Sequence, residues 1–447
     1  MKNTNSQPSW QEILNNALIK RSFGSSELHS LIKKAQKDYL HWDAFKYQKM
    51  PNDFTSEEAW AALKLNRSSL YQPTPIMANN GRNFQFALVN SLYQKLNYID
   101  TYASGFIKTL SETKPSEAQK NKFIITGITE EAIATSQIEG ANTTRQAAKE
   151  MLASQRAPRT RDEQMIINSY QTMQRLDVWK DLDLSKDMLL EIQKLVTEKT
   201  LKDPNGQGRF RNDKDAIVVH DPITGEVVHT PPKEREMHKQ LERLINFANR
   251  KEDEGDFIHP CIKASILHFW LAYLHPFVDG NGRTARTLFY WYLLKKEYWL
   301  VQYLSISRAI VQSRKRYDDA FIHSERDDND ITYFLFYIAD AFKISIVKFV
   351  EYFERKLNEM ERFKKVANRL ENYNSRQVAL LHHFMEHPNE VIDVGMHQTK
   401  QGVSRQTAHI DLMDLVKKGM LVQTVKKGTR KYVFMPNIQF IRKLFKA

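Results

Sequence analysis

The sequence predicts a mainly α-helical protein with two small β-hairpins, and three observations support this fold class. Apolar residues recur at three- and four-residue steps through most of the 447 residues, which is the spacing of amphipathic helices. From Arg283 to His387 the chain contains neither glycine nor proline, so no strong helix breaker interrupts that stretch. Short β-branched runs occur between residues 206 and 232 and between residues 420 and 435, where hairpins are therefore expected.

Residues 1–115 are expected to form a helical N-terminal region. Polar segments at residues 72–75 and 79–81 contain Pro, Asn and Gly, and are expected to be breaks between its amphipathic helices. No group of residues in this region indicates a chemical role. A further helix is expected over about residues 129–140, because glycine commonly terminates helices and Gly140 stands at its end.

A β-hairpin is expected over about residues 214–232. The runs Ala216–His220 and Glu226–Thr230 are rich in β-branched residues, and residues 221–225 between them contain proline and glycine. Two such runs around a turn are typical of a hairpin.

An apolar run over residues 261–274 predicts a buried helix. Pro276 lacks an N–H group and disfavours helical geometry in the residue before it, so this helix is expected to end at Leu274. Phe277 is expected to be a buried packing residue. Cys261 is the only cysteine; it cannot form an internal disulfide, which fits a reducing cytoplasm, and we expect it to be buried on this helix.

The segment that follows has the residues of an anion site. Gly280 and Gly282 flank Asn281, and both glycines are expected to allow positive φ, which brings backbone N–H groups close to an anion. A helix is expected from Arg283 onward, and the positive end of its dipole would further favour a phosphate.

Four side chains of the same segment suit the handling of a nucleotide. Arg283 and Arg286 are three residues apart, so on a helix they share a face and can bind successive phosphates. Asp279 offers a hard oxygen for Mg²⁺, which commonly needs only one or two carboxylates beside the phosphates. His275 can accept a proton near neutral pH. Each fragment alone is also found in ordinary surface turns, but the combination predicts a nucleotide site.

Residues 275–286 resemble the signature of the Fic family, His-Pro-Phe-x-Asp-Gly-Asn-Gly-Arg-x-x-Arg, at every fixed position. Members typically transfer AMP from ATP to a hydroxyl group of a target protein. The resemblance implies a helical Fic core over residues 116–345, with His275 as general base and Asp279 as the Mg²⁺ ligand. It further implies that Gly280, Asn281 and Gly282 form the anion hole for the α- and β-phosphates. By the same resemblance, Arg283 and Arg286 would bind the more distal phosphates.

Residues 135–140 resemble the inhibitory motif of the same family, Ser/Thr-x-x-x-Glu-Gly/Asn, with Thr135 and Glu139 at the matching positions. In the family this glutamate pairs with the second arginine of the signature, here Arg286. A carboxylate in that place would exclude the γ-phosphate, so the resemblance implies an enzyme with low activity by default. An ordinary helix ending at Gly140 is the alternative. The hairpin at 214–232 resembles the family's flap, which positions target residues by strand-like pairing.

The C-terminal part is expected to be a separate module. Residues 346–373 are expected to form a connecting helix, and residues 374–447 three helices followed by a hairpin, which resembles a winged helix-turn-helix. In a DNA complex of such a module two sets of side chains would be used: Ser404, Arg405, Gln406, Thr407 and His409 toward bases, and Lys426, Lys427, Arg430 and Lys431 toward the backbone. Winged helices also serve as protein-docking and dimerisation modules, so a homodimer is a further option.

Composition and charge limit the function classes. The formal net charge of +13 fits ATP or an acidic partner, and equally a solvated basic surface. No apolar run approaches the roughly 20 residues that cross a bilayer, and residues 1–8 lack the apolar region of a signal peptide. A cytoplasmic protein without a membrane partner is therefore expected.

Several functions remain in competition. The main prediction is a protein adenylyltransferase that uses Mg–ATP, modifies Ser, Thr or Tyr of an unidentified target protein, and modifies itself. One alternative is a DNA-binding transcriptional regulator whose Fic domain senses a nucleotide. Another is removal of AMP, with Glu139 activating water. Family members that act as kinases have a lysine where this chain has Gly282 and Arg283, so that activity is disfavoured.

Overall fold

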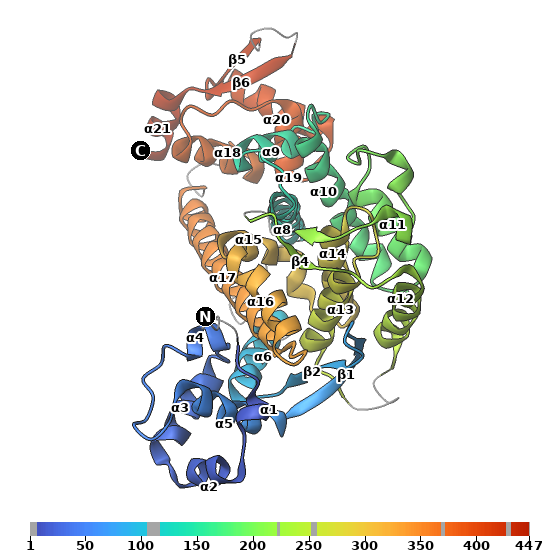
Figure 1. Cartoon of the computed structure of the whole chain (residues 1–447). Coiled ribbons are helices and arrows are strands. Elements are labelled where there is room, and N and C mark those ends of the chain that lie inside the picture. Colours follow the sequence, from blue (N-terminus) through green and yellow to red (C-terminus); the bar gives the residue numbers. More distant parts are fainter. Residues whose placement is uncertain are drawn as a thin grey trace.

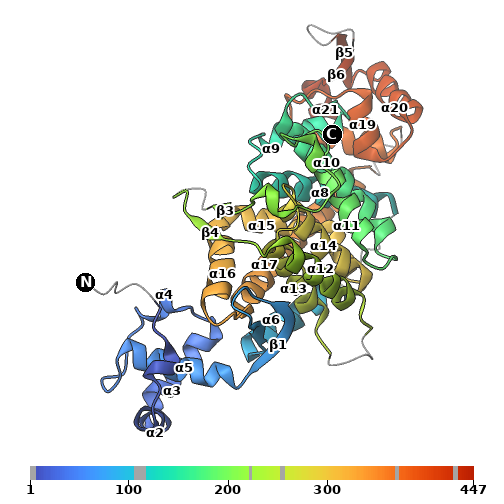
Figure 2. The ribbon, with the colours of Figure 1, turned by 45° about the vertical axis from the view of Figure 1, so that its right-hand side comes forward.

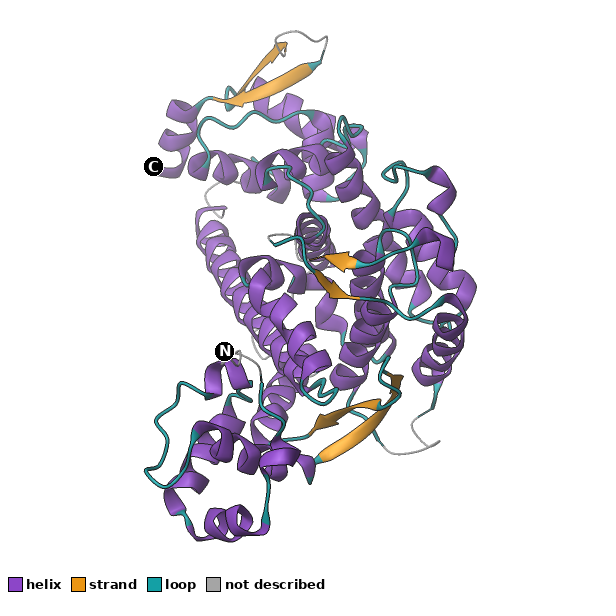
Figure 3. Cartoon of the chain, viewed as in Figure 1, coloured by secondary structure: helices purple, strands orange, loops and turns teal. Residues whose placement is uncertain are grey.

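The computed structural model describes residues 7–104, 117–220, 224–251, 257–367, 372–425 and 431–446. The protein is mainly helical, as predicted, and its described β structure consists of three two-stranded antiparallel sheets. Each sheet is a short hairpin beside a much larger mass of helices (Figure 3). No helix within the described ranges is both long enough and apolar enough to span a bilayer.

The N-terminal helices lie at one end of the molecule (Figure 1). They enclose a small core around Phe45 and Trp60, both fully buried. The last of these helices begins with a capping box, in which Thr55 and Glu58 each bind the other's backbone N–H. The helices of this core are α1 (Trp10–Ile13), α2 (Asn16–Gly24), α3 (Ser26–Lys37), α4 (Trp42–Phe45) and α5 (Ser56–Ser68). The other described elements within residues 1–115, the expected N-terminal region, pack in the central core instead.

Residues 72–75 and 79–81 lie between α5 and α6 (Asn90–Ala103), as expected, but this break contains a β-hairpin that was not predicted. Residues 72–75 belong to β1 (Tyr71–Met77), which pairs with β2 (Asn83–Ala87), and residues 79–81 lie in the turn between the two strands. Among the described strands β1 pairs only with β2, so the prolines at 73 and 75 of this edge strand are tolerated. The buried side chains of Ile76 and Phe84 join this hairpin to the central core.

A buried ion pair connects the N-terminal helices to the central part. The Nζ atom of Lys64 lies 2.8 Å from an Oδ1 atom of Asp327, and both side chains are fully buried. Lys64→Met would leave the carboxylate buried without its main cation, so we expect the free energy of unfolding to fall by about 3–5 kcal/mol. Chemical denaturation would measure this change. Arg82→Met is the matched control: that side chain is 63% exposed and lies 3.8 Å from Asp328, so a change of about 0–1 kcal/mol is expected. Equal effects of the two substitutions would contradict the assignment.

The central part is built around α13 (Pro260–Leu274) and α14 (Asn281–Lys295), which the signature segment joins. Nearly all residues of both helices are buried, so other elements enclose them on most sides. The surrounding helices are α6 (Asn90–Ala103), α8 (Glu117–Ile138), α9 (Arg145–Ala153), α10 (Arg161–Trp179), α11 (Lys186–Val196), η1 (Pro204–Gly206), η2 (Asp213–Asp215), α12 (Glu234–Asn249), η4 (Trp299–Tyr303), α15 (Ile306–Gln312), α16 (Arg314–Arg326) and α17 (Thr332–Ala367).

The flap hairpin is present but shorter than predicted. It consists of β3 (Val219–His220) and β4 (Val227–His229), and Val219 pairs with His229. Residues 216–218 were expected to be strand; instead Ala216 has a left-handed conformation (φ 47°) and ends η2. Capping contacts made by Asn212 and Asp215 stabilise this 3₁₀ turn, which sequence periodicity does not reveal. Residues 221–223 of the expected turn lie outside the described residues.

The C-terminal module has its own hydrophobic core and lies at the other end of the molecule, beside α9 and α10 (Figures 1 and 2). The predicted order of three helices and a hairpin is present, and a fourth helix that was not predicted follows it. Helix α17, 36 residues long, continues without a break across the expected boundary at 345/346. The elements of the module are α18 (Ser375–Glu386), α19 (Val394–Gln401), α20 (Arg405–Lys417), β5 (Leu421–Val425), β6 (Tyr432–Pro436) and α21 (Ile438–Lys446).

The candidate DNA-contacting residues are placed only in part. Arg405, Gln406 and His409 are exposed on α20. Ser404 caps the same helix by accepting a hydrogen bond from the N–H of Thr407. Of the residues expected to contact the DNA backbone, Lys426, Lys427 and Arg430 lie outside the described residues. Lys431 is exposed directly before β6.

Candidate active site

The predicted helix break lies directly before the candidate base. Helix α13 ends at Leu274, and His275 takes a left-handed conformation with φ 46°. The Nδ1 atom of His275 lies 3.3 Å from the carbonyl oxygen of Ala272. With Nδ1–H as the donor, the lone pair of Nε2 is free to accept a proton. Burial, and next the charge of His229, lower the pKa of His275 to about 4, so the ring is neutral at pH 7.

The loop after His275 is held rigidly by Phe277 and Asn281. Phe277 is fully buried, as predicted, and stacks on Phe210 with ring centroids 5.4 Å apart. The Asn281 side chain accepts a hydrogen bond from the N–H of Phe277 (2.9 Å) and donates one to its carbonyl (2.8 Å). The side chain of Asn281 therefore braces the loop, and only its backbone N–H remains for the anion hole that was predicted to contain it.

Only one of the two glycines has the backbone conformation that was expected. Gly280 has φ 85°, as predicted, and a Cβ atom there would lie 2.7 Å from Cγ2 of Thr197. Gly282 is helical, because α14 begins at Asn281 and not at Arg283; the expectation of positive φ at Gly282 is therefore wrong. A Cβ atom at Gly282 would lie 2.2 Å from Oε1 of Glu139. The absence of a side chain at Gly282 thus allows the carboxylate of Glu139 to lie against the first turn of α14.

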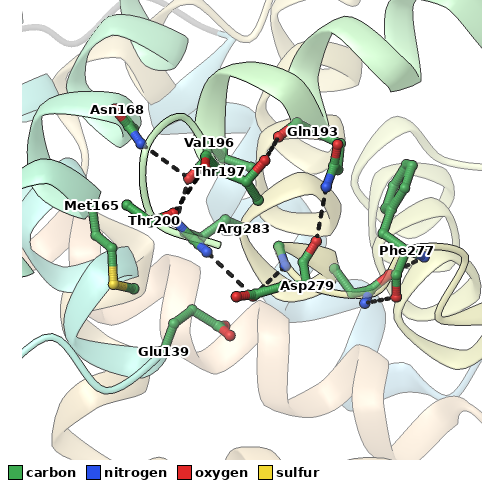
Figure 4. A network of polar contacts seen from close by, with 12 residues as sticks. Glu139, Met165, Asn168, Gln193, Val196, Thr197, Thr200, Phe277, Asp279 and Arg283 are labelled. Carbon is green, nitrogen blue, oxygen red and sulfur yellow. Dashed lines mark hydrogen bonds and ion pairs between the residues drawn. The ribbon is translucent and has the colours of Figure 1, made fainter. Parts of the chain in front are cut away.

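Arg283 and Asp279 lie beside one another in the site and are joined by a polar contact (Figure 4). Arg283 is buried and donates through Nη1 to the carbonyl of Val196, while its Nη2 lies 3.4 Å from Oδ1 of Asp279. Its Nε atom has no hydrogen-bond partner among the described residues. The other oxygen of Asp279 lies 3.6 Å from Arg161, and the side chain is 36% exposed. One accessible carboxylate fits the needs of Mg²⁺, which takes its other ligands from phosphates and water.

The predicted contact between Glu139 and Arg286 is present. Arg286 is buried and donates through Nη2 to Oε1 of Glu139 at 2.7 Å. Its Nε donates to the hydroxyl of Thr135 at 2.7 Å, and Nη2 also reaches the Thr135 carbonyl at 3.2 Å. Burial alone would raise the pKa of Glu139, but Arg286 and then Arg283 outweigh it and hold the pKa below its usual value. The carboxylate is therefore ionised at the N-terminus of α14.

Three residues of the site were not assigned roles from the sequence. Thr135 is the second partner of Arg286, and its place in the inhibitory motif was the only available signal. Gln193 donates to the backbone carbonyl of Asp279 at 3.2 Å, and Arg161 approaches the Asp279 carboxylate. Neither of these two lies in a recognisable motif, so only the fold reveals them.

The fold and site together define a helical protein with a neutral histidine beside the N-terminus of a buried helix. Residues 183–293 match the model of the Fic/DOC family, and this segment contains the histidine, the loop and the first turns of α14. The resemblance to the Fic/DOC family is therefore shown for this segment.

Curated relatives match over part of their length. The chain is 28% identical over 162 residues to the protein adenylyltransferase Fic of Nematostella vectensis, which covers 36% of this chain and 33% of that relative. It is 30% identical over 113 residues to the protein of the same name in Drosophila mojavensis, which covers 25% of this chain and 20% of that relative. The chain therefore spans a third or less of the length of these relatives.

Solved structures of similar proteins cover more of the chain at lower identity. A Fic family protein from Desulfovibrio desulfuricans G20 is 17% identical, with a TM-score of 0.48, covering 82% of this chain and 98% of that one. Fic-1 from C. elegans is 21% identical, with a TM-score of 0.44, covering 58% and 71%. Both scores are below 0.5, so the resemblance to the Fic/DOC family rests on the sequence matches.

Proposed function

We propose that the protein is an adenylyltransferase that transfers AMP from ATP to a hydroxyl group of a target protein. The observation that carries this proposal is the position of His275, a neutral base with a free Nε2 lone pair, in the loop that leads into the N-terminus of α14. The first N–H groups of α14 have no intrahelical partner and, with the helix dipole, favour phosphate. The names of the curated relatives agree with this activity.

The reaction follows from these groups. Nε2 of His275 accepts the proton of the target hydroxyl, and the hydroxyl oxygen attacks the α-phosphorus of ATP. The bond between the α-phosphorus and the oxygen that bridges to the β-phosphorus breaks, so pyrophosphate leaves with the bonding electron pair. The backbone at Gly280, Asn281 and Gly282 would hold the phosphates, and Arg283 would add positive charge. Asp279 would hold Mg²⁺, which supplies neutralisation of phosphate charge when bound.

We further propose that Glu139 inhibits the resting enzyme. Its carboxylate lies against Gly282 and binds Arg286, so an anion of the chain itself takes the place at the helix start that a phosphate would need. Phosphate binding would require this charge-assisted contact to break. Target protein, acceptor residue and DNA binding by the C-terminal module stay predictions from the sequence.

Isotope placement tests the reaction class. The Glu139→Gly chain would be incubated with Mg²⁺ and ATP carrying the label in either the α- or the γ-phosphate. Label from the α-position should appear in protein, on this chain or on a lysate protein, with a mass gain equal to AMP. Incorporation of the γ-label would indicate a kinase, and incorporation of neither would overturn the proposal.

A further inference from the structure

The last carbonyl groups of α13 are bound by side chains from the flap and its base. His229, at the end of β4, has its Nε2 atom 2.7 Å from the carbonyl oxygen of Tyr273. The other ring nitrogen, Nδ1, lies 2.8 Å from Oε2 of Glu325 on α16. Only 9% of the His229 side chain is exposed. One flap residue, His229, is thus in contact with the last turn of α13, two residues before His275.

These contacts use both ring nitrogens of His229. A carbonyl oxygen and a carboxylate oxygen are both acceptors, so a protonated ring can donate to both of them at once. Glu325 is the ion-pair partner of the protonated ring. In a largely buried site such a pair holds its geometry tightly, because breaking it would leave a desolvated charge.

Arg211, which precedes the flap in the sequence, also binds the residues around His275. Its Nε donates to the carbonyl of His275 at 2.7 Å, and its backbone N–H donates to the carbonyl of Pro276 at 2.8 Å. Nη2 reaches the carbonyl of Leu274 at 3.3 Å and also binds the carbonyl of Pro232, where the flap ends. Arg211 is buried. The chain before the flap and the chain after it are therefore both tied to the residues around His275.

We propose that His229 is a positioning residue, which couples the flap to the general base through its paired contacts with Tyr273 and Glu325. The base role of His275 rests on the proposed function. A target segment that pairs with the flap would then be held at a fixed distance from Nε2 of His275. Loss of the coupling would loosen the base relative to the target while leaving the nucleotide site in place, because none of the phosphate-binding residues contacts His229 in the described structure.

The pKa of His275 depends on nearby charges, so the proposal can be tested by titration without following a reaction. The groups that act on it are His229 from β4, Glu139 after α8 and Arg211 before the flap. Burial lowers the pKa of His275 most, His229 and Arg211 lower it further, and Glu139 raises it. Removal of the His229 charge should therefore raise the pKa of His275, whereas a His229 that merely fills space would leave it unchanged.

The test is an NMR titration of the His275 ring in the nucleotide-free full chain, for wild type, His229→Gln and Glu325→Gln. Glu325→Gln keeps the shape of the acceptor and removes only its charge, so it covers the case in which His229→Gln does not fold. We expect His229→Gln to raise the pKa of His275 above about 4, because the charge of His229 is lost. Glu325→Gln removes the carboxylate that stabilises the charged form of His229, so it should shift the pKa of His275 in the same direction. His220→Gln, an exposed flap histidine on β3, is the matched control and should leave it unchanged. An unchanged His275 titration in both variants would overturn the proposal.

A kinetic measurement separates this proposal from the proposed function. In the Glu139→Gly background, His229→Gln should lower kcat and raise KM for a protein target while the Kd for ATP stays constant. A fall in ATP affinity without a change in the target's KM would contradict the positioning role. Absence of transfer in every variant would count against the proposed function, whereas the NMR titration would still decide the contact between His229 and the His275 segment.

Discussion

Glu139→Gly is expected to raise the initial rate of AMP transfer by about 10- to 100-fold. A hydrogen bond to a charged group contributes about 1.5–3 kcal/mol, and about 1.4 kcal/mol corresponds to a factor of ten. The contact of Glu139 with Arg286 at 2.7 Å is of this kind, and the carboxylate also lies against Gly282 at the helix start. Removal of the side chain frees both for phosphate. Initial rates of α-label incorporation at a fixed, subsaturating ATP concentration would measure the change.

Glu139→Gln is the matched control for this prediction. The amide retains the size of the side chain and can accept a hydrogen bond from Arg286, but it lacks the negative charge. We therefore expect a rate between those of wild type and Glu139→Gly. An unchanged or reduced rate in Glu139→Gly, with ATP binding intact by calorimetry, would contradict inhibition by this contact.

In the same background, His275→Ala is expected to lower the rate of transfer by about 10²–10⁴-fold, the range of a positioned general base. The Kd for ATP should change little, because within the described residues the hydrogen bond of the His275 ring is with the carbonyl of Ala272 and not with a phosphate-binding residue. Single-turnover rates and calorimetry would separate the two effects. His29→Ala, an exposed histidine of the N-terminal helices, is the control and should leave both values unchanged. Full activity in His275→Ala would remove the histidine from the mechanism.

The pH profile gives an independent reading of the base. Burial and the charge of His229 hold the pKa of His275 at about 4. The base is needed in its neutral form, which is the form present above that value. Because the charge of Glu139 raises this pKa, the Glu139→Gly variant should lose activity only as the pH falls to about 4 or below. An ordinary histidine with a pKa of about 6.5 would instead lose activity between about pH 7 and pH 6. Profiles of kcat/KM for Glu139→Gly distinguish the two cases.

Local rules were sufficient for several parts of the fold and site. The helix end at Leu274 follows from Pro276, the buried position of Phe277 from its apolar setting, and the C-terminal helices from their periodicity and caps. The contact of Glu139 with Arg286 spans 147 residues of sequence, and only the resemblance to a family made it predictable. No local pattern carries such information.

The failures have two physical causes. Asn281 contacts the backbone of Phe277, four residues away, and residue spacing alone does not reveal this side-chain contact within the loop. Gly282 gives space to Glu139, which is distant in sequence, and does not need a positive φ angle. The role of Arg211 depends on carbonyl groups more than sixty residues away. β1 was not predicted because prolines are unusual in strands. Its position beside β2, which makes it an edge strand that tolerates prolines, is seen only in the structure.

The attachment of Glu139 to the same chain as its arginine has a consequence for how such an enzyme would respond to its surroundings. A competitor on the same chain acts at a local effective concentration set by the length and stiffness of α8 and not by the amount of protein in solution. Dilution of the protein would therefore leave Glu139 bound to Arg286. Higher ATP would displace the carboxylate only gradually, so a rapid response would require something that moves α8 itself.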